Sequence, residues 1–277
     1  MAEKRERNRG RAGDKTVALL GLPWDGSSSF MTGPALAPPL IREAMWSDST
    51  NPWAENGLDL GAEGVLHDAG DLDLESGPDP WPLMEEGAGS LWDAGHLPIF
   101  LGGDHSVTHP LVRAAAGRFP GLSILHLDAH PDLYHDFQGD PRSHASPLAR
   151  IMEEGLARRL VQVGLRTVTA HQRDQAARFG VEMMELKDLD PGLKLSFRGP
   201  VYLSLDLDVL DPAFAPGVSH PEPGGLSVRR VLGFIQNMRG DLIGADIVEY
   251  NPRQDAGGLT AMVAAKFIKE IAARMME

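Results

Sequence analysis

The chain has 277 residues, enough for one large α/β domain with a substantial core. It has 26 basic against 39 acidic residues, a formal net charge of −13, so we expect no binding to nucleic acid or to an anionic membrane. Cysteine is absent, which excludes disulfides, thiolate metal sites and a cysteine nucleophile. No run of about 18 apolar residues occurs, and so no membrane span is predicted.

The first 14 residues are highly charged and lack the apolar run of a secretory signal. We expect residues 1–14 to form a disordered tail and residues 15–277 to form a single domain. A transit peptide is disfavoured, because Glu3, Glu6 and Asp14 interrupt the basic residues. Together with the absence of cysteine, this favours a cytoplasmic location.

Strands and helices alternate along the rest of the chain. Residues 16–23 predict a buried strand, 24–40 a loop rich in Gly, Ser and Pro, and 38–46 and 79–94 two helices. Five strand segments follow, each with a helix after it: 98–105 and 107–117, 122–130 and 146–158, 159–166 and 169–179, 200–212 and 227–238, and 241–252 and 258–274. This predicts a mostly parallel sheet covered by helices on both faces, with functional residues at the carboxyl ends of the strands.

Acidic residues and histidines lie at the ends of four predicted strands, where apolar residues would be expected. The segment GGDHS (102–106) follows one strand, and DAHPD (128–132) ends the next. Asp206 and Asp208 end a third strand, and Glu249 ends the last. Side chains two residues apart on a strand point to the same side, so the acid and histidine of DAHPD project together, as do the two aspartates.

These clustered carboxylates predict bound cations, because unpaired buried charges are costly. Four aspartates supply four negative charges, which two divalent ions would neutralise, and histidines add neutral nitrogen ligands. The candidate ligands are His105, Asp128, His130, Asp132, Asp206 and Asp208. Such an oxygen-rich set suits Mn²⁺ but leaves Fe²⁺, Zn²⁺ and Co²⁺ open. Each motif alone could be a turn or a helix cap, so the prediction depends on their joint occurrence.

The three motifs together resemble those of the ureohydrolases, the family of arginase, agmatinase and relatives. The family's GGDHS, DAHxD and SxDxDxxDP segments are matched by Gly102–Ser106, Asp128–Asp132 and Ser204–Pro212, and the resemblance runs from about Gly21 to the C-terminus. It implies a three-layer α/β/α arginase-like fold, with one ureohydrolase catalytic domain over residues 15–277. It also implies two Mn²⁺ ions per chain, a small cationic guanidine as substrate, and a homotrimer or homohexamer.

By position, the resemblance assigns a role to each candidate residue. The ligands would be His105 and Asp132 for one metal, His130 and Asp208 for the other, and Asp128 and Asp206 as bridges. Glu249 matches the carboxylate that holds the guanidinium, and His144, in SHASP, matches a proton-shuttling histidine that also contacts substrate. A bound metal can lower the pKa of a water from about 16 to about 7, which would let it attack the guanidinium carbon. Asp132 is the candidate for proton transfer to the leaving amine.

The loop after DAHPD indicates the substrate. Arginases bind an α-carboxylate with a loop rich in Thr, Ser and Asn at this place, whereas residues 133–140 read LYHDFQGD. Asp136 and Asp140 would repel a carboxylate and tolerate an ammonium, which favours agmatine, hydrolysed to putrescine and urea, and makes agmatinases the most similar relatives. The alternative is that both acids are solvent-exposed and irrelevant to selectivity. Another guanidine, such as 4-guanidinobutyrate, another guanidino acid, a smaller guanidine or arginine, also stays open.

The roles of two further histidines and two alternative functions also follow from the sequence. His126 shares strand parity with Asp128, so we predict a hydrogen-bonded role behind the ligands. His220, in GVSHPEPGG, occupies a position where many relatives carry a small or hydroxyl residue, and both substrate contact and packing are open. A metal-dependent amide deacetylase would use one zinc ion, and a non-catalytic polyamine- or guanidine-binding protein would show no turnover.

Overall fold

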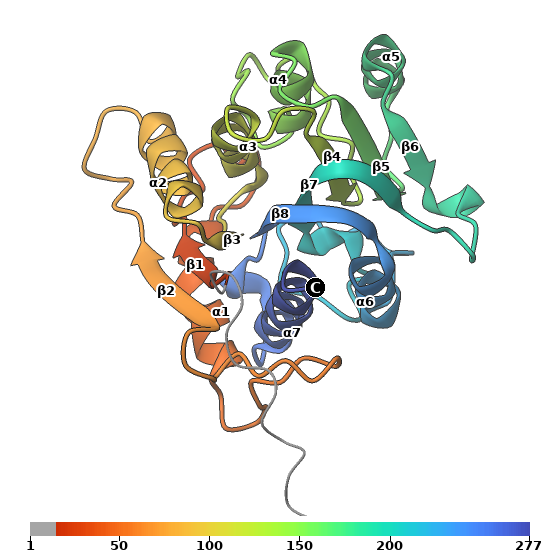
Figure 1. Cartoon of the computed structure of the whole chain (residues 1–277). Helices are drawn as coiled ribbons and strands as arrows, with labels where there is room; N and C mark the ends of the chain where they lie inside the picture. Colours follow the sequence, from red (N-terminus) through yellow and green to blue (C-terminus); the bar gives the residue numbers. More distant parts are fainter. Residues whose placement is uncertain (1–14) are drawn as a thin grey trace, which may run out of the picture.

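Short apolar runs form the strands of one eight-stranded sheet in the computed structural model, which describes residues 15–277 (Figure 1). The predicted disordered tail, residues 1–14, lies outside the described residues. The strand order is β2-β1-β3-β8-β7-β4-β5-β6, and every neighbouring pair is parallel. The strands are β1 (Val17–Gly21), β2 (Leu66–Asp71), β3 (Leu97–Leu101), β4 (Ser123–Leu127), β5 (Arg159–Leu165), β6 (Glu182–Glu185), β7 (Ser196–Asp206) and β8 (Arg239–Val248).

Helices cover both faces of this sheet, as predicted. In Figure 1, α2, α3, α4 and α5 lie on one side and α1, α6 and α7 on the other, which gives the predicted three-layer α/β/α sandwich. The helices are α1 (Ala37–Met45), α2 (Trp81–Asp93), α3 (Thr108–Ala116), α4 (Pro147–Glu153), α5 (Ala170–Phe179), α6 (Val228–Asn237) and α7 (Leu259–Met275). Five 3₁₀ turns connect them: η1 (Pro34–Leu36), η2 (His105–Val107), η3 (Leu186–Asp188), η4 (Leu207–Val209) and η5 (Pro252–Gln254).

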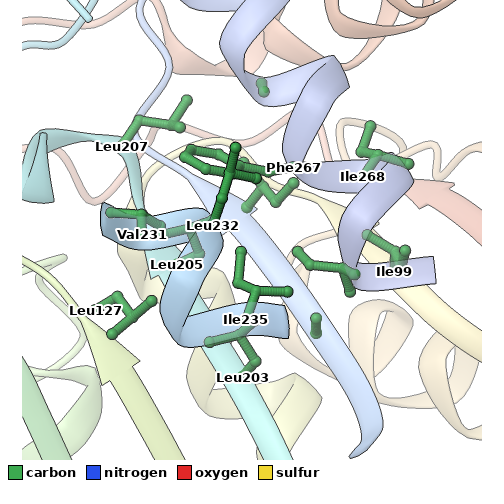
Figure 2. Close-up of a cluster of buried hydrophobic side chains, with 14 of the residues drawn as sticks. Ile99, Leu127, Leu203, Leu205, Leu207, Val231, Leu232, Ile235, Phe267 and Ile268 are labelled. Carbon is green, nitrogen blue, oxygen red and sulfur yellow. The ribbon is translucent and has the colours of Figure 1, made fainter. Parts of the chain in front are cut away.

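The two faces of the central strands carry different side chains. On β7, Leu203 and Leu205 point into the apolar layer under α6 and α7, together with Leu127 of β4 (Figure 2). Each such fully buried side chain contributes about 1.5–3 kcal/mol to stability. The alternate side chains of β7, among them Ser204, point to the opposite face because successive residues of a strand alternate. This alternation lets one strand contribute both to the core and to a polar site.

Two strands, β2 and β6, were not predicted from the sequence. Both are edge strands, and β2 is mostly exposed while β6 is only four residues long. Edge strands bury little apolar surface, so their sequences lack the apolar run on which the other predictions depended. The helix predicted over 146–158 is also shorter than expected and ends at Glu153.

No helix within residues 15–277 is both long and apolar enough to cross a membrane.

Candidate active site

The four central strands of the sheet, β3, β8, β7 and β4, bring the predicted site residues to one edge, except His144, which the loop before α4 supplies. Their carboxyl ends lie together because neighbouring strands are parallel. His105 lies in η2 after β3, and Asp208 lies in η4 after β7. The remaining residues come directly at or after strand ends: Asp128, His130 and Asp132 after β4, Asp206 at the end of β7, and Glu249 after β8.

His105 is oriented by a chain of hydrogen bonds from beneath. Its Nε2 lies 2.9 Å from Ser204 Oγ, and Ser204 Oγ donates to Asp246 Oδ1 at 2.8 Å. Since the single hydroxyl proton of Ser204 goes to Asp246, the hydroxyl oxygen accepts from Nε2–H of His105. Nδ1 therefore carries the free lone pair, the tautomer that a metal ligand needs.

This Nδ1 faces only carboxylate oxygens. It is buried and makes no hydrogen bond within the described residues, yet it lies 3.0 Å from Asp132 Oδ2, 3.1 Å from Asp128 Oδ2 and 3.2 Å from Asp206 Oδ2. The lone pairs of these four ligand atoms point to one place, so a cation is needed between them to offset their mutual repulsion. Burial disfavours the imidazolium, but the three carboxylates outweigh burial and raise the pKa of His105 well above its ordinary value.

A second group of the same kind lies beside the first. His130 Nδ1 is 2.9 Å from Asp208 Oδ2 and 3.4 Å from Asp128 Oδ1. Asp128 thus directs one oxygen to each group. Burial and the neighbouring Asp128 raise the pKa of Asp208 to about 6, although His130 opposes this, and burial with two neighbouring aspartates raises the pKa of Asp206 well above its ordinary value. The donor set and its unbalanced charge fit two divalent cations.

His126 acts on Asp128 from behind. Gln162 Nε2 donates to Pro131 O at 2.6 Å and lies 3.0 Å from His126 Nδ1. A carbonyl oxygen only accepts, which fixes the orientation of the amide, so His126 Nδ1 accepts and its Nε2–H donates to Asp128 Oδ2 at 2.8 Å. His126 lies where the sequence placed it, and its Nε2 is committed to a carboxylate rather than free to bind a metal.

Glu249 and His144 form a buried pair at the same edge. His144 Nδ1 is 2.8 Å from Glu249 Oε1, which also accepts from the backbone N–H of His105 at 2.9 Å. Burial disfavours the charged imidazole, but the carboxylate of Glu249 outweighs this and raises the pKa of His144 to about 9. On its other side, His144 Nε2 accepts from the backbone N–H of Ser29 at 3.2 Å and lies 2.8 Å from Ser29 Oγ. His144 thus joins Glu249 to a hydroxyl at the pocket wall.

Two of these residues have a strained backbone. Asp132 has φ of 50° and Glu249 has φ of 63°, the left-handed region that non-glycine residues rarely adopt. Such a conformation costs about 1–3 kcal/mol and persists only where the surroundings impose it. For Glu249 the backbone N–H donates to Gly103 O at 2.9 Å, which helps to hold it there. Strain of this kind is typical of positions retained for function rather than for stability.

These residues line a cavity of about 280 Å³. Its acidic groups and His130 come from the strand ends, His144 and His220 come from the loops before α4 and α6, and neutral side chains from the 134–145 loop and the start of α5 form much of the rest of the wall. The lining residues are Ser29, His130, Asp132, Tyr134, Phe137, His144, Ala145, Thr167, Thr169, Gln172, Asp206, Asp208, His220 and Glu249. No lysine or arginine is among them.

Asp136 and Asp140, on which the preference for agmatine depended, do not line this cavity. Both are exposed, and both stabilise their own loop: Asp136 Oδ1 accepts from Gly139 N at 3.1 Å, and Asp140 Oδ1 accepts from Arg142 N at 2.8 Å. The geometry therefore favours the alternative in which these acids have no direct effect on the substrate's tail.

Several residues of the pocket wall were not predicted from the sequence. Ser29 comes from the 24–40 loop, which Asp104 holds in place by accepting from Ser27 N at 2.9 Å and from Ser28 Oγ at 3.2 Å. Thr169 and Gln172 come from the start of α5, where they form a capping box. Their polar side chains are also ordinary turn and cap residues, so no sequence signal separated the two roles.

Comparison with known proteins places these features in one family. A model of the arginase family matches residues 15–273. Arginase 2, chloroplastic/mitochondrial, of Arabidopsis thaliana is 50% identical over 94% of this chain and 80% of its own, and an agmatinase of Bacillus anthracis is 33% identical over 93% and 91%. Among solved structures, the arginase from Medicago truncatula has 47% identity and a TM-score of 0.90, covering 95% of this chain and 88% of that one.

Proposed function

Because the chain belongs to the arginase family of metal-dependent ureohydrolases, we propose that it hydrolyses the guanidinium group of L-arginine to urea and an amine. The observation that carries hydrolysis is the convergence of two imidazoles and four carboxylates, with Asp128 in the middle, beside the Glu249–His144 pair. We propose that residues 15–277 form one catalytic domain. The catalytic residues are Asp132, His144 and Glu249, of which His144 and Glu249 also bind substrate.

We propose that the metal ligands are the six that the sequence predicted. His105 and Asp132 would hold one ion, His130 and Asp208 the other, and Asp128 and Asp206 both. The position of Asp128, with one oxygen toward each histidine, supports its bridging role. Mn²⁺ is the proposed metal, because the set is rich in oxygen and contains no sulfur. When bound, two such ions supply a water that is nucleophilic at neutral pH.

The protein residues bind the substrate and move protons. Glu249 accepts two parallel hydrogen bonds from the planar guanidinium, which presents the carbon to the aspartates at the strand ends. The carbon–nitrogen bond to the amine breaks only when that nitrogen is protonated, and Asp132, which lines the cavity beside Glu249, transfers to it the proton that the attacking water gives up. His144 exchanges protons with solvent or the leaving amine, since its raised pKa lets it hold one at neutral pH.

Arginine is the first candidate substrate for two reasons. The relatives that are 45–50% identical are named arginases, whereas the named agmatinases are 33% identical. In addition, the neutral outer wall of the cavity does not repel a carboxylate, because Asp136 and Asp140 point elsewhere. Agmatine is the second candidate. It has no carboxylate, and the residues that line the cavity include no basic side chain that would pair with one. The two substrates differ only in that carboxylate, so a direct comparison separates them.

Urea release from Mn²⁺-reconstituted protein tests the proposal on L-arginine, agmatine, 4-guanidinobutyrate and guanidine. We expect the highest kcat/KM on arginine; a higher value on agmatine would select the second candidate. No urea from any guanidine would refute hydrolysis and favour a binding protein. Metal analysis should give two ions per chain, and one ion would favour a deacetylase-like centre.

Assembly and location are further proposals. We propose a homotrimer or homohexamer, which sedimentation of the intact chain would measure. We propose a cytoplasmic location, which fractionation of the native cells would test. The names of the relatives place several of them in mitochondria or chloroplasts, so such an experiment separates this chain from those proteins.

A further inference from the structure

Two aromatic side chains, Tyr134 and Phe137, line the active-site cavity. Their ring centroids lie 5.1 Å apart, with an angle of 59° between the ring planes. Both side chains are half-buried, unlike the fully buried apolar side chains of the core. Part of each ring is therefore open to a molecule bound in the cavity.

The fold holds both rings in place. The ring of His171, at the start of α5, stacks on that of Tyr134, with centroids 5.6 Å apart and planes 11° apart. The backbone N–H of Tyr134 donates to Ala145 O at 3.2 Å, and Phe137 and Asp140 exchange backbone hydrogen bonds of 3.1 and 3.0 Å. A substrate therefore meets rings that are already ordered, which lowers the entropic cost of binding against them.

The rings lie two strands away from the proposed guanidinium-binding carboxylate. Glu249 follows β8, Tyr134 follows β4, and β7 lies between these strands. Neighbouring strands are about 4.8 Å apart, so the two strand ends are about 10 Å apart. One cavity is lined by both residues, so the tail of a guanidine bound at Glu249 can extend along it. An extended chain of four carbons and a nitrogen covers most of this distance.

The wall around the rings offers no carboxylate to a positively charged tail. Asp136 and Asp140 do not line the cavity, and their carboxylates accept from their own loop. Gln172 and Thr169 satisfy each other, because Gln172 Oε1 accepts from both the backbone N–H and the hydroxyl of Thr169 at 3.0 Å. The aromatic rings are therefore the groups on this side that can attract a cation.

We propose that Tyr134 and Phe137 are specificity-determining residues, which select guanidines whose tail carries an ammonium. The inference rests on the proposed hydrolysis of a guanidine, and it names the part of the substrate that these rings recognise. The electrons of an aromatic ring attract a cation placed over its face, and the ring also packs against methylene groups. L-Arginine and agmatine carry an ammonium on the tail, whereas 4-guanidinobutyrate and butylguanidine do not.

Two pairs of guanidines isolate the ammonium. L-Arginine differs from 5-guanidinopentanoate, and agmatine from butylguanidine, only in that group. The measured quantity is the ratio of kcat/KM within the pair that contains the better substrate. Where the ammonium-free member is not hydrolysed, its Ki as a competitive inhibitor is compared with the KM of the other member.

We expect Tyr134→Leu to lower this ratio about 5- to 30-fold, the effect of one cation–π contact, with two metals retained. Most of the loss should fall on the ammonium-bearing member of the pair. Tyr134→Phe keeps the ring and should keep most of the ratio. Phe214→Leu removes an exposed ring that does not line the cavity, so it is the matched control and should give the wild-type ratio.

The proposal is overturned if Tyr134→Leu keeps the ratio within about twofold of wild type, since an equal loss on both members indicates a structural role. An equal decrease in Tyr134→Phe would also overturn it, because the hydroxyl rather than the ring would then be responsible. If Tyr134→Leu does not fold, Phe137→Leu decides: a ratio at least about threefold below wild type supports the proposal, and a smaller change overturns it. A wild-type chain that releases no urea would instead refute the proposed function, and the two failures are therefore distinguishable.

Discussion

Gln162 acts on the metal centre through His126 and Asp128. It fixes the tautomer of His126, which in turn fixes the orientation of Asp128. We expect Gln162→Leu to weaken metal affinity by about 10- to 100-fold, the usual effect of losing a hydrogen bond behind a ligand. Titration against a competing chelator measures this. Gln175→Leu, another buried glutamine but on α5, should keep wild-type affinity. Equal affinities for all three proteins would show that Gln162 only packs.

Asp128 itself is central at this scale, since its two oxygens face both histidine groups. Asp128→Asn removes the negative charge and replaces one carboxylate oxygen with an amide nitrogen, which donates hydrogen bonds and cannot bind a metal. We expect loss of both metal occupancy and turnover, with occupancy determined by metal analysis after dialysis. Retention of two ions and full activity would contradict the bridging role.

A substitution at Glu249 tests substrate binding separately from metal binding. Glu249→Gln removes the charge that pairs with the guanidinium but leaves every proposed ligand in place, so we expect two metals to remain and kcat/KM to fall by at least about 100-fold, roughly 3 kcal/mol. Steady-state urea release together with metal content tests this. An unchanged rate would remove Glu249 from substrate binding.

The sequence predicted the residues that bear charge and, behind them, His126, but not the neutral residues that orient them. Acids and histidines at strand ends are conspicuous, because their burial needs compensation. Ser204 and Gln162 are ordinary strand residues in sequence, and only the parallel register, which sets His126 beside Gln162 and Ser204, gives them a role. The positive φ of Glu249 was equally hidden, since it arises from contacts with the turn after β3.

At the scale of elements, Gly103 lies in the turn after β3, where three parts of the site meet. They are the loop that carries Ser29, the η2 turn that carries His105, and Glu249 after β8. A Cβ there would lie 1.6 Å from Trp24 O, the atom that accepts from Asp104 N, so any side chain displaces the loop that carries Ser29. We expect Gly103→Ala to destabilise the fold by about 1–3 kcal/mol, a Tm decrease of about 2–10 °C, and to abolish most activity. Gly117→Ala at the end of α3, where the nearest atom is 3.9 Å away, is the matched control and should leave Tm unchanged. Similar Tm values for the two variants would contradict this account.

Element prediction succeeded where burial gives a pattern and failed where it does not. The strands that carry the site are central, apolar on at least one face and easily recognised. The exposed edge strand β2 and the short β6 were missed for the opposite reason. The layer order followed from strand–helix alternation, whereas the strand order β3-β8-β7-β4, which assembles the site, depends on long-range pairing that local sequence does not encode.

For the whole molecule, metal binding and folding are linked through pH. In the metal-free chain the pKa of Asp208 is raised to about 6 and that of Asp206 well above its ordinary value. A carboxyl with a higher pKa in the folded than in the unfolded state is protonated first in the folded state, so acidification from about pH 7 toward pH 4 favours the metal-free fold. The raised pKa values of His105 and His130 act in the same direction, but only above their unfolded pKa of about 6.5. Divalent ions need the deprotonated ligands, so the stabilisation they provide decreases over the same range.

Thermal unfolding of Mn²⁺-loaded and EDTA-treated protein should therefore give a Tm difference that is large near pH 7.5 and small near pH 5. A difference independent of pH would mean that these side chains do not hold the ions, because no other cluster of acids in the described chain combines such burial with such mutual proximity.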